Sequence, residues 1–393
     1  MRRFRQILVA LLLFAGLAPA QQLRSLTILH TNDLHARFLP DGRGRGGFTH
    51  VAQALRREKD KCGACLVLNG GDLVQGSPVS TIYRGVPIYE VANLIGFDVS
   101  TLGNHEFDYG WRMIPKFLRK ARFATVAANV VDARGRLLTP QAYTIRNVAG
   151  IRVAVIGALT ADLPSLSTPD LLGPWRALPV LETVRRYAAE VRDRADLIVV
   201  LAHINPAEED QILRQAPEIA VVVSGHVHRG LEYSKQVDGR VAVRVRAFGE
   251  EIGRLDMQFD LAAKKVVSNS WRRIEIDSQA ITPAEDVAAL VARWEAKVSK
   301  IVDVPIGEAR REFSRADLQA LMEQSMLEAM KADLAFMNEG GVRDFLPQGR
   351  LLARHVWNIM PFDNKLVMGR FAGSQLPPAV TKEIGRASCR ERV

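Results

Sequence analysis

The sequence predicts an α/β fold with a largely parallel sheet, and two observations support this prediction. Between residues 25 and 230, segments with the pattern of strands alternate with segments that have the pattern of helices, as in successive β-α-β units. The strand segments are continuous apolar runs, which are typical of strands buried on both faces. The clearest runs are residues 26–29, 66–68, 99–102, 197–201 and 220–223.

The segments between these runs complete the alternation. Helices are expected at residues 49–59, 87–95, 111–120 and 181–194, and one further strand at 151–157. From residue 231 to 276 the pattern changes to alternating strands, which we expect to complete a second sheet. A helix is then expected from Thr282 to Lys300, with Pro283 at its first helical position.

A short polar motif stands at the end of each clear apolar run. In chain order, the motifs are Asp33-Leu34-His35, Gly71-Asp72, Gly103-Asn104-His105-Glu106, Ala202-His203 and Gly225-His226-Val227-His228. In open α/β sheets, reactive groups collect beyond the carboxyl ends of the strands. We therefore expect the motifs to converge on one edge of one sheet. Histidine, aspartate and asparagine side chains are residue types that bind metal ions.

The order of the five motifs resembles that of the calcineurin-like metallophosphoesterase superfamily. Residues 28–35 and 103–110 narrow the resemblance to the secreted 5′-nucleotidase and UDP-sugar hydrolase family, and residues 338–343 with 361–364 resemble the start of its C-terminal domain. The family fold is an α/β/β/α sandwich of two sheets. The resemblance implies three units: a catalytic domain at 25–277, a linker helix at 282–300, and part of an α+β substrate-binding domain at 301–382.

The resemblance also implies a site for two divalent metal ions. Asp72 would bridge the ions, Asp33, His35 and His228 would complete one site, and Asn104, His203 and His226 would complete the other. Mixed nitrogen and oxygen ligands favour zinc, manganese, iron or cobalt over calcium or magnesium alone. Two such ions make hydroxide available near neutral pH, which would attack the phosphoryl group.

A histidine–aspartate pair is expected beside the metals. By the resemblance, His105 pairs with Asp108 and either stabilises charge on the phosphoryl oxygens or protonates the leaving oxygen. Glu106 is expected to have only a structural role. The histidines outside the motifs are interpreted as ordinary hydrogen-bonding residues; they are His30, His50 and His355.

The second domain is expected to select the substrate. Arg343 matches an arginine that contacts substrate in the family, while Phe362 and Asn364 match a segment that supplies one base-stacking aromatic and one polar contact. Arg310 and Arg311 are weaker candidates. The function implied is phosphate release from nucleoside 5′-phosphates. Alternatives are UDP-sugar hydrolysis, 2′,3′-cyclic-nucleotide phosphodiesterase activity and thiosulfohydrolysis; a non-enzymatic metal-stabilised binding module would need a lost ligand or a lost pair, and both are present.

The N-terminus has the features of a secretory signal peptide. A basic start, an apolar stretch at 7–17 and the small-residue sequence Ala18-Pro19-Ala20 occur in the expected order. The apolar stretch is too short to span a bilayer permanently. We therefore expect cleavage after Ala20 and a periplasmic or extracellular protein without a membrane span.

The last residues of the chain, 383–393, resemble an in-frame translation of a sequencing adaptor. We expect this tail to be an artefact and the natural chain to continue beyond about Lys382. The formal net charge is +10, but three arginines belong to the signal and three to the tail. The remainder is mildly basic, which suits a small anionic substrate better than nucleic acid. The sequence does not indicate an oligomeric state.

Two cysteines remain outside the tail, Cys62 and Cys65. One C-x-x-C motif cannot supply four zinc ligands. In an oxidising compartment a local disulfide is the simplest interpretation. Two free thiols or a redox-active pair are the alternatives.

Overall fold

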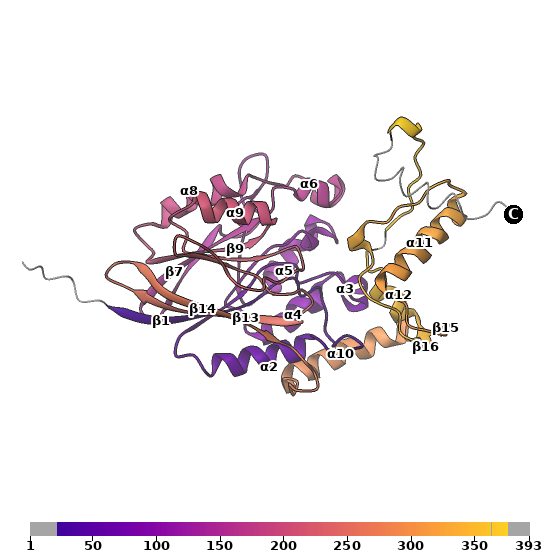
Figure 1. Ribbon diagram of the computed structural model, residues 1–393, viewed down its shortest axis with the longest axis horizontal. Coiled ribbons are helices and arrows are strands. Elements are labelled where there is room, and N and C mark those ends of the chain that lie inside the picture. The colour runs from indigo at the N-terminus through magenta and orange to yellow at the C-terminus, as the bar shows by residue number, and fades with distance from the viewer. Residues whose placement is uncertain (1–21, 363, 376–393) are drawn as a thin grey trace, which may run out of the picture.

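The computed structural model describes residues 22–362 and 364–375. The expected signal peptide at 1–20 and the adaptor-like tail at 383–393 lie outside the described residues. Two six-stranded sheets pack face to face, and helices cover the outer face of each sheet (Figure 1). The α/β/β/α sandwich expected from the sequence is confirmed.

The first sheet has the strand order β14-β13-β1-β2-β3-β4. Its strands β1 to β4 run parallel, whereas β13 pairs antiparallel with β1, so that Ile28 lies between Leu66 and Leu255. Strand β14 then pairs antiparallel with β13. The strands are β1 (Leu23–Thr31), β2 (Cys65–Asn69), β3 (Val99–Thr101), β4 (Ala124–Val126), β13 (Glu251–Asp260) and β14 (Lys265–Glu275).

The second sheet has the strand order β11-β12-β10-β9-β7-β6. The four middle strands run parallel, and an antiparallel strand closes each edge. The strands are β6 (Tyr143–Val148), β7 (Ile151–Leu159), β9 (Leu197–His203), β10 (Val221–Gly225), β11 (Lys235–Val237) and β12 (Arg240–Val243).

One expectation about the sheets was wrong, and another holds in part. The motifs do not share one sheet edge, because the first three follow strands of the first sheet and the last two follow strands of the second. Of the strands in residues 231–276, β11 and β12 complete the second sheet as expected, whereas β13 and β14 extend the first. Local patterns identify buried strands, but pairing partners are set by long-range packing that a local pattern does not contain.

Alternate residues of the central strands face two different cores. On β9, Leu197, Val199 and Leu201 point into the core between the sheets. Ile198 and Val200 point the other way, into the core beneath the outer helices. This alternation explains why the strands are apolar on both faces.

Helices complete both outer layers. Helices α2 (Phe48–Lys59), α4 (Val86–Ile95) and α5 (Ile114–Lys120) pack on the first sheet, and α8 (Val180–Val191) and α9 (Pro206–Gln215) pack on the second (Figure 1). Helix α4 ends as expected at Gly96, which has a φ of 92°. Shorter elements are α3 (Pro78–Ile82), η1 (His105–Phe107), η2 (Trp111–Met113), β5 (Val130–Val131), α6 (Leu163–Leu166), α7 (Pro169–Leu172) and β8 (Arg176–Ala177).

A long helix, α10 (Glu285–Val302), leads out of the sandwich. It begins at Glu285, so Pro283 is not its first helical residue as expected. The preceding Ala284 is extended, with a ψ of 118°, and its N–H donates to the Thr49 carbonyl at the start of α2. This contact holds the chain extended for one residue beyond the proline.

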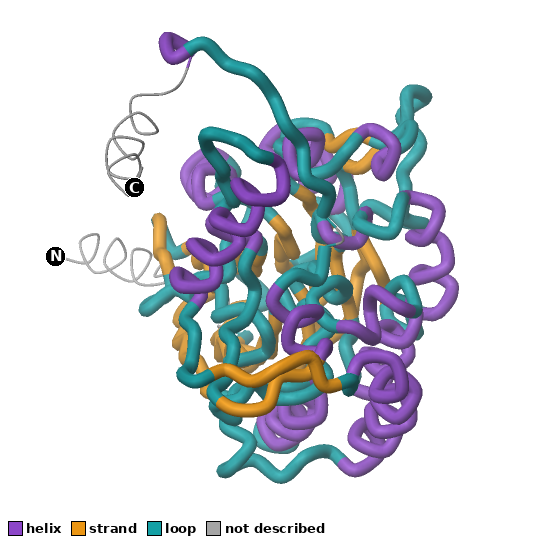
Figure 2. Tube along the Cα trace, turned by 90° about the vertical axis from the view of Figure 1, so that its right-hand side faces the viewer, coloured by secondary structure: helices purple, strands orange, loops and turns teal. Residues whose placement is uncertain are grey.

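The residues after α10 form a small C-terminal part. Figure 2 views the molecule from the side of this part, which lies in front of the sandwich. Its small core consists of Ala309, Leu318, Val342, Leu346 and Ile359. Its elements are β15 (Pro305–Ala309), α11 (Arg315–Met330), η3 (Glu339–Gly341), β16 (Gly349–Leu352), α12 (Ala353–Ile359) and η4 (Gly373–Gln375).

The residues interpreted as structural have structural partners. Cys62 and Cys65 form a disulfide across the turn between α2 and β2, with their Cα atoms 6.1 Å apart. His30 is buried and accepts a hydrogen bond from Trp271 (3.0 Å). His50 contacts Thr49, and His355 accepts from the N–H of Leu352. Within the described residues, no helix is both long enough and apolar enough to cross a membrane.

Candidate metal centre and active site

The loops that carry the five motifs meet where strands of both sheets end. The donor atoms of Asp33, His35, Asp72 and His228 all lie within 4.8 Å of one another. The Nε2 atom of His35 lies 2.8 Å from Nε2 of His228 and 3.6 Å from Oδ2 of Asp72. These residues come from three different loops, and they make up the bridge and one of the two expected metal sites.

The residues expected for the other metal site lie on the far side of Asp72. The Nε2 atom of His203 is 3.1 Å from both Oδ1 of Asn104 and Oδ2 of Asp72. The ring of His226 lies 4.9 Å from the ring of His203. Asp72 therefore lies between the two groups of donors, as a bridging ligand must.

The hydrogen bonds around these donors fit a cation. The Nδ1 atom of His203 faces the carbonyl of Gly70 (2.8 Å) and must donate to it, so the neutral ring presents a lone pair at Nε2. Oδ2 of Asp72 is buried and accepts no hydrogen bond of good geometry from any residue the structure describes. A lone-pair nitrogen, an amide oxygen and a carboxylate oxygen thus converge without a donor, which is the chemistry of a divalent metal site.

Electrostatics favour the same interpretation. Burial lowers the pKa of His226 and of His228 to about 4 and holds the pKa of His35 well below its ordinary value, so these rings are neutral, as ligands must be. Burial also opposes charge on His203, yet Asp72 and Asp33 raise its pKa to about 10. The two carboxylates therefore favour positive charge at this position.

The backbone at the candidate ligands is strained. A left-handed conformation costs a residue other than glycine about 1–2 kcal/mol. Five of the seven candidate ligands adopt it, namely Asp33 (φ 52°), His35 (46°), Asp72 (53°), His226 (92°) and His228 (57°). One position in these loops has no room for a side chain and is glycine: a Cβ at Gly103 would overlap the carboxylate of Asp72.

Three residues without an assigned ligand role hold the ligands in place. Asn32 donates to the carboxylate of Asp33 (2.6 Å) and to the carbonyl of Val245 (3.0 Å). The carboxylate of Glu106 accepts from the N–H groups of Asp72 and Gly103, which agrees with its expected structural role. Phe248 packs against the rings of His35 and His228, with both ring centres 5.3 Å away. Asn32 precedes a motif residue and could have been noticed, but the sequence contains no signal for Phe248.

His105 and Asp108 form the expected pair. The Nδ1 atom of His105 lies 2.7 Å from Oδ2 of Asp108, and the His105 backbone N–H donates to Oδ1 of Asp72 (3.0 Å). Burial opposes the charged form of His105, but Asp108 and Asp72 outweigh it and raise its pKa above the ordinary value. The pair thus stands directly beside the candidate bridging ligand.

A cavity of about 510 Å³ opens over these residues and is lined by both parts of the chain. Arg343 reaches in from the C-terminal part, 3.2 Å from Nδ1 of His228 and 3.2 Å from Nε2 of His105. The ring of Phe362 lies 4.8 Å from the Arg343 guanidinium and 5.7 Å from the His105 ring, inclined at 24° to it. Asn364 lines the same cavity.

Other parts of the cavity wall differ from what the sequence indicated. Arg310 and Arg311 do not line the cavity, and Arg311 instead pairs with Asp317 (3.1 Å). The segment around α6 and α7 contributes Leu166 and Leu171 to the wall. That segment carries no motif, so no sequence pattern predicted its place there.

A buried ion pair supports the loop of the last motif. The carboxylate of Glu209 on α9 accepts from Ser224, just before the loop, and from Arg244 (2.8 Å). Arg244 also donates to the carbonyl of Arg229, just after the loop (2.8 Å). Glu209 is fully buried, and Arg244 is nearly so. The pair therefore clamps both ends of the segment that carries His226 and His228.

Replacing Glu209 with alanine is expected to lower the free energy of unfolding by about 3–5 kcal/mol, because it leaves the Arg244 charge buried without its partner. Urea denaturation would measure the loss. Lys235 is the matched control: it also contacts Glu209 (2.9 Å) but is 31% exposed, so Lys235→Met should have a small effect. A loss below about 1 kcal/mol for Glu209→Ala would contradict the clamp.

Comparison with known protein families agrees with this geometry. Residues 26–230, just over half of the chain, match the family described as calcineurin-like phosphoesterase. The chain belongs to this family of metal-dependent phosphoester hydrolases. Residues 296–392 match the family described as 5′-nucleotidase, C-terminal domain. The second match runs into the adaptor-like tail, whose assignment stays a prediction.

Individual relatives resemble most of the chain. A 5′-nucleotidase of Vibrio vulnificus is 27% identical over 409 residues, which cover 89% of this chain and 74% of the relative. Endonuclease YhcR of Bacillus subtilis is 28% identical over 401 residues, and the matched region is 91% of this chain but only 33% of that protein. The crystal structure of a 5′-nucleotidase precursor from Thermus thermophilus superposes with a TM-score of 0.79 at 25% identity, covering 86% of this chain and 74% of that one.

Proposed function

We propose that this chain is a 5′-nucleotidase-type phosphohydrolase that releases phosphate from nucleoside 5′-phosphates. The class of reaction follows from the family, and the substrate is the proposal. The single observation that carries it is the shared cavity, where an arginine and an aromatic ring of the C-terminal part face the candidate metal ligands. The metal ligands and the arginine are suited to bind a phosphate group, and the aromatic ring is suited to stack on a nucleobase.

The proposed division of labour assigns each group one task. The seven motif residues would hold two divalent ions, which polarise the phosphoryl group and lower the pKa of water. Zinc, manganese, iron or cobalt would suit these donors. By the resemblance to the family motifs, Asp72 would contact both ions, Asp33, His35 and His228 would hold one, and Asn104, His203 and His226 would hold the other.

His105 acts from beside the candidate ligands, with its ring centre 5.1 Å from that of His35. Asp108 accepts a hydrogen bond from the Nδ1–H of His105 and keeps the ring oriented, so that Nε2 faces the cavity and stabilises the phosphoryl oxygens or protonates the departing oxygen. Arg343 binds the same phosphate through its guanidinium. Phe362 stacks on the base, a contact worth about 1–3 kcal/mol, and Asn364 supplies a polar contact.

The parts of the chain are assigned separate roles. We propose that the sandwich (25–277) performs the chemistry, that residues 282–300 link it to the substrate-binding part, and that residues 301–382 belong to that part. We also propose that residues 1–20 direct the protein out of the cytoplasm and are removed. We propose a small anionic substrate and not a nucleic acid, because the chain without its two ends is only mildly basic.

A UDP-sugar hydrolase is the second candidate, because a uridine base and a phosphate would use the same ring and arginine. Cyclic-nucleotide phosphodiesterase activity is less favoured, since it needs no terminal phosphate. Thiosulfohydrolysis is least favoured, because that substrate has no base to stack on Phe362.

The test measures released phosphate from nucleoside 5′-monophosphates and an aryl phosphate, and separates the products of UDP-glucose and 2′,3′-cyclic nucleotides by chromatography, because hydrolysis of these two yields phosphate monoesters and no free phosphate. Nucleoside 5′-monophosphates are expected to be hydrolysed most efficiently, and formation of UMP and glucose 1-phosphate from UDP-glucose without phosphate release from any monophosphate would select the second candidate. Chelation is expected to abolish every activity, and Mn²⁺, Zn²⁺ or Co²⁺ to restore it. Full turnover by exhaustively metal-free protein would overturn the mechanism.

A further inference from the structure

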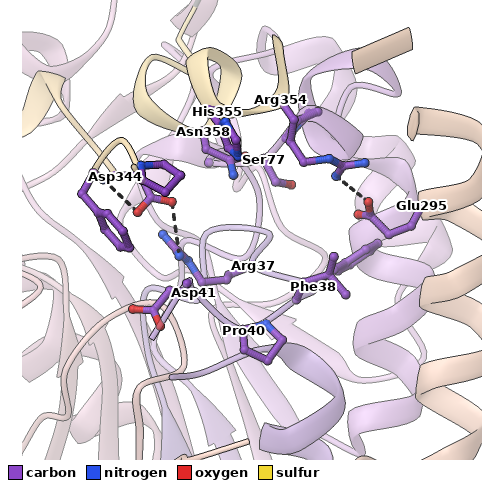
Figure 3. Close-up of a pocket in the computed structure, with 16 residues that line it drawn as sticks. Arg37, Phe38, Pro40, Asp41, Ser77, Glu295, Asp344, Arg354, His355 and Asn358 are labelled. Atoms are coloured by element: carbon purple, nitrogen blue, oxygen red, sulfur yellow. Dashed lines mark hydrogen bonds and ion pairs between the residues drawn. The ribbon is translucent and has the colours of Figure 1, made fainter. Parts of the chain in front are cut away.

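We propose that the ion pair between Arg37 and Asp344 is a positioning device that sets the Arg343 guanidinium over the candidate metal centre. It deepens the proposed function and rests on it. Arg37 belongs to the sandwich and Asp344 to the C-terminal part, and their charged groups lie 3.6 Å apart. Figure 3 shows the pair on one wall of a second cavity, of about 230 Å³, between the two parts.

On the sandwich side, Arg37 is connected to the candidate ligands by packing. It follows His35 by two residues, and its guanidinium lies 5.0 Å from the centre of the Phe248 ring. Phe248 in turn packs against His35 and His228. The position of the Arg37 side chain is therefore fixed relative to the metal ligands.

On the C-terminal side, Asp344 directly follows Arg343. Oδ1 of Asp344 accepts from the N–H of Phe345 (3.0 Å), which leaves Oδ2 to face Arg37. The N–H of Arg343 donates to the carbonyl of Ile359 (2.9 Å), so this turn is attached to the core of the C-terminal part. A displacement of Asp344 therefore also displaces the backbone of Arg343, from which the guanidinium extends over the candidate metal centre.

The Arg37–Asp344 ion pair is largely buried, so its two charges attract each other more strongly than those of an exposed pair. Both side chains are 14% exposed, so water screens them little. A second contact between the parts, Arg43 with Glu312 (3.1 Å), is 58% and 51% exposed, and Arg43 also lies over the Phe345 ring (5.0 Å). The opposite wall of the cavity carries Arg354 and Glu295 (2.6 Å), which join α12 to α10 (Figure 3). Glu312 of the exposed pair is thus the control for a charge reversal.

The test is a charge-swap cycle in the full chain, with nucleoside 5′-monophosphate and aryl phosphate as substrates. Arg37→Glu and Asp344→Arg are each expected to lower kcat/KM for the nucleotide by about 10- to 10²-fold, mainly through KM, because a small misplacement of a binding group has effects of this size. The double variant exchanges the two charges, so the ion pair can form again with the opposite polarity. Its kcat/KM for the nucleotide should return to near that of the parent. Arg37→Lys keeps the charge and should stay within a few-fold of the parent.

The controls distinguish a misplaced Arg343 from a general loss of folded protein. Glu312→Arg should leave nucleotide kinetics unchanged, and aryl phosphate hydrolysis should fall together with nucleotide hydrolysis in the Arg37 and Asp344 variants, because Arg343 is assigned to the phosphate group that both substrates carry. Thermal unfolding of the parent, the two single variants and the double variant should show coupling: the change in stability of the double variant should differ from the sum of the two single changes. This measurement needs no substrate.

The outcomes distinguish this inference from the proposed function. A parent protein that hydrolyses the aryl phosphate but no nucleotide would refute the proposed function, while coupling in thermal unfolding would still report on the pair. A parent active on nucleotides whose single variants are unaffected, or whose double variant stays as impaired as the worse single one, would overturn the inference.

Discussion

Replacing Asp72 with asparagine is expected to reduce phosphate release by about 10³-fold or more, because several kcal/mol of charge stabilisation depend on the metal site. Asparagine keeps an oxygen for the N–H of His105 and tolerates the φ of 53° at this position. It exchanges the buried, unpartnered Oδ2 for an amide NH₂ that cannot ligate. Metal analysis should show fewer than two ions per chain, alongside the kinetic loss.

His228→Ala is the comparison for Asp72→Asn. His228 is a candidate ligand for one ion only and is partly exposed, and Arg343 already donates to its Nδ1. In the neutral ring this contact leaves the proton on Nε2, so His228 must change its hydrogen bonding before it can ligate. Its loss should therefore cost less than the loss of Asp72. Two bound ions in Asp72→Asn, or a larger defect in His228→Ala, would argue against the bridge.

Replacing His105 with asparagine is expected to lower kcat by about 10²–10⁴-fold while metal content stays unchanged. The side chain of His105 faces the cavity and Asp108, whereas its backbone N–H contacts Asp72. The substitution removes the ring and keeps the backbone contact, so the metal ligands should be undisturbed. Turnover with saturating nucleotide and metal analysis of the same preparation would measure both quantities.

Asp108→Asn tests the second member of the pair. It leaves the His105 ring in place but removes the carboxylate that favours its charged form, so the loss of kcat should be smaller and in the same direction. If His105→Asn retained the turnover of the parent, the pair would have only a structural role.

The sequence located the candidate ligands because their chemistry is local. A run such as 197–201 identifies a buried strand, and a strand end places His203 at the rim of a sheet, whichever sheet that is. The wrong assignment of the motifs to one sheet therefore did not misplace any of them. Loop geometry that brings Asp33 and His203 within 3.9 Å of each other arises from packing between the sheets.

Contacts between distant segments were not predictable in the same way. Phe248 and Leu171 have no neighbouring motif, and although Arg37 lies two residues after His35, nothing in the sequence marks Asp344 as its partner. Each gains its role only when another part of the chain packs beside it. The start of α10 was misplaced for a related reason. Proline is a good local signal, but the next residue, Ala284, is extended and donates to a residue of α2, a contact between distant segments.

The backbone strain at the candidate ligands lowers the stability of the folded protein, while the proposed hydrolysis needs their side chains. Stability and turnover therefore conflict at these positions. Glycine has no steric penalty in the left-handed region, so replacing such a ligand relieves about 1–2 kcal/mol. This gain exceeds the roughly 0.5–1 kcal/mol that glycine costs in chain entropy. At the partly exposed His226 and His228, directed evolution that selects for heat resistance alone would therefore enrich glycine and accumulate inactive enzyme, whereas removal of the buried His35 ring would leave a cavity. Any such selection on this protein must score hydrolysis in the same round.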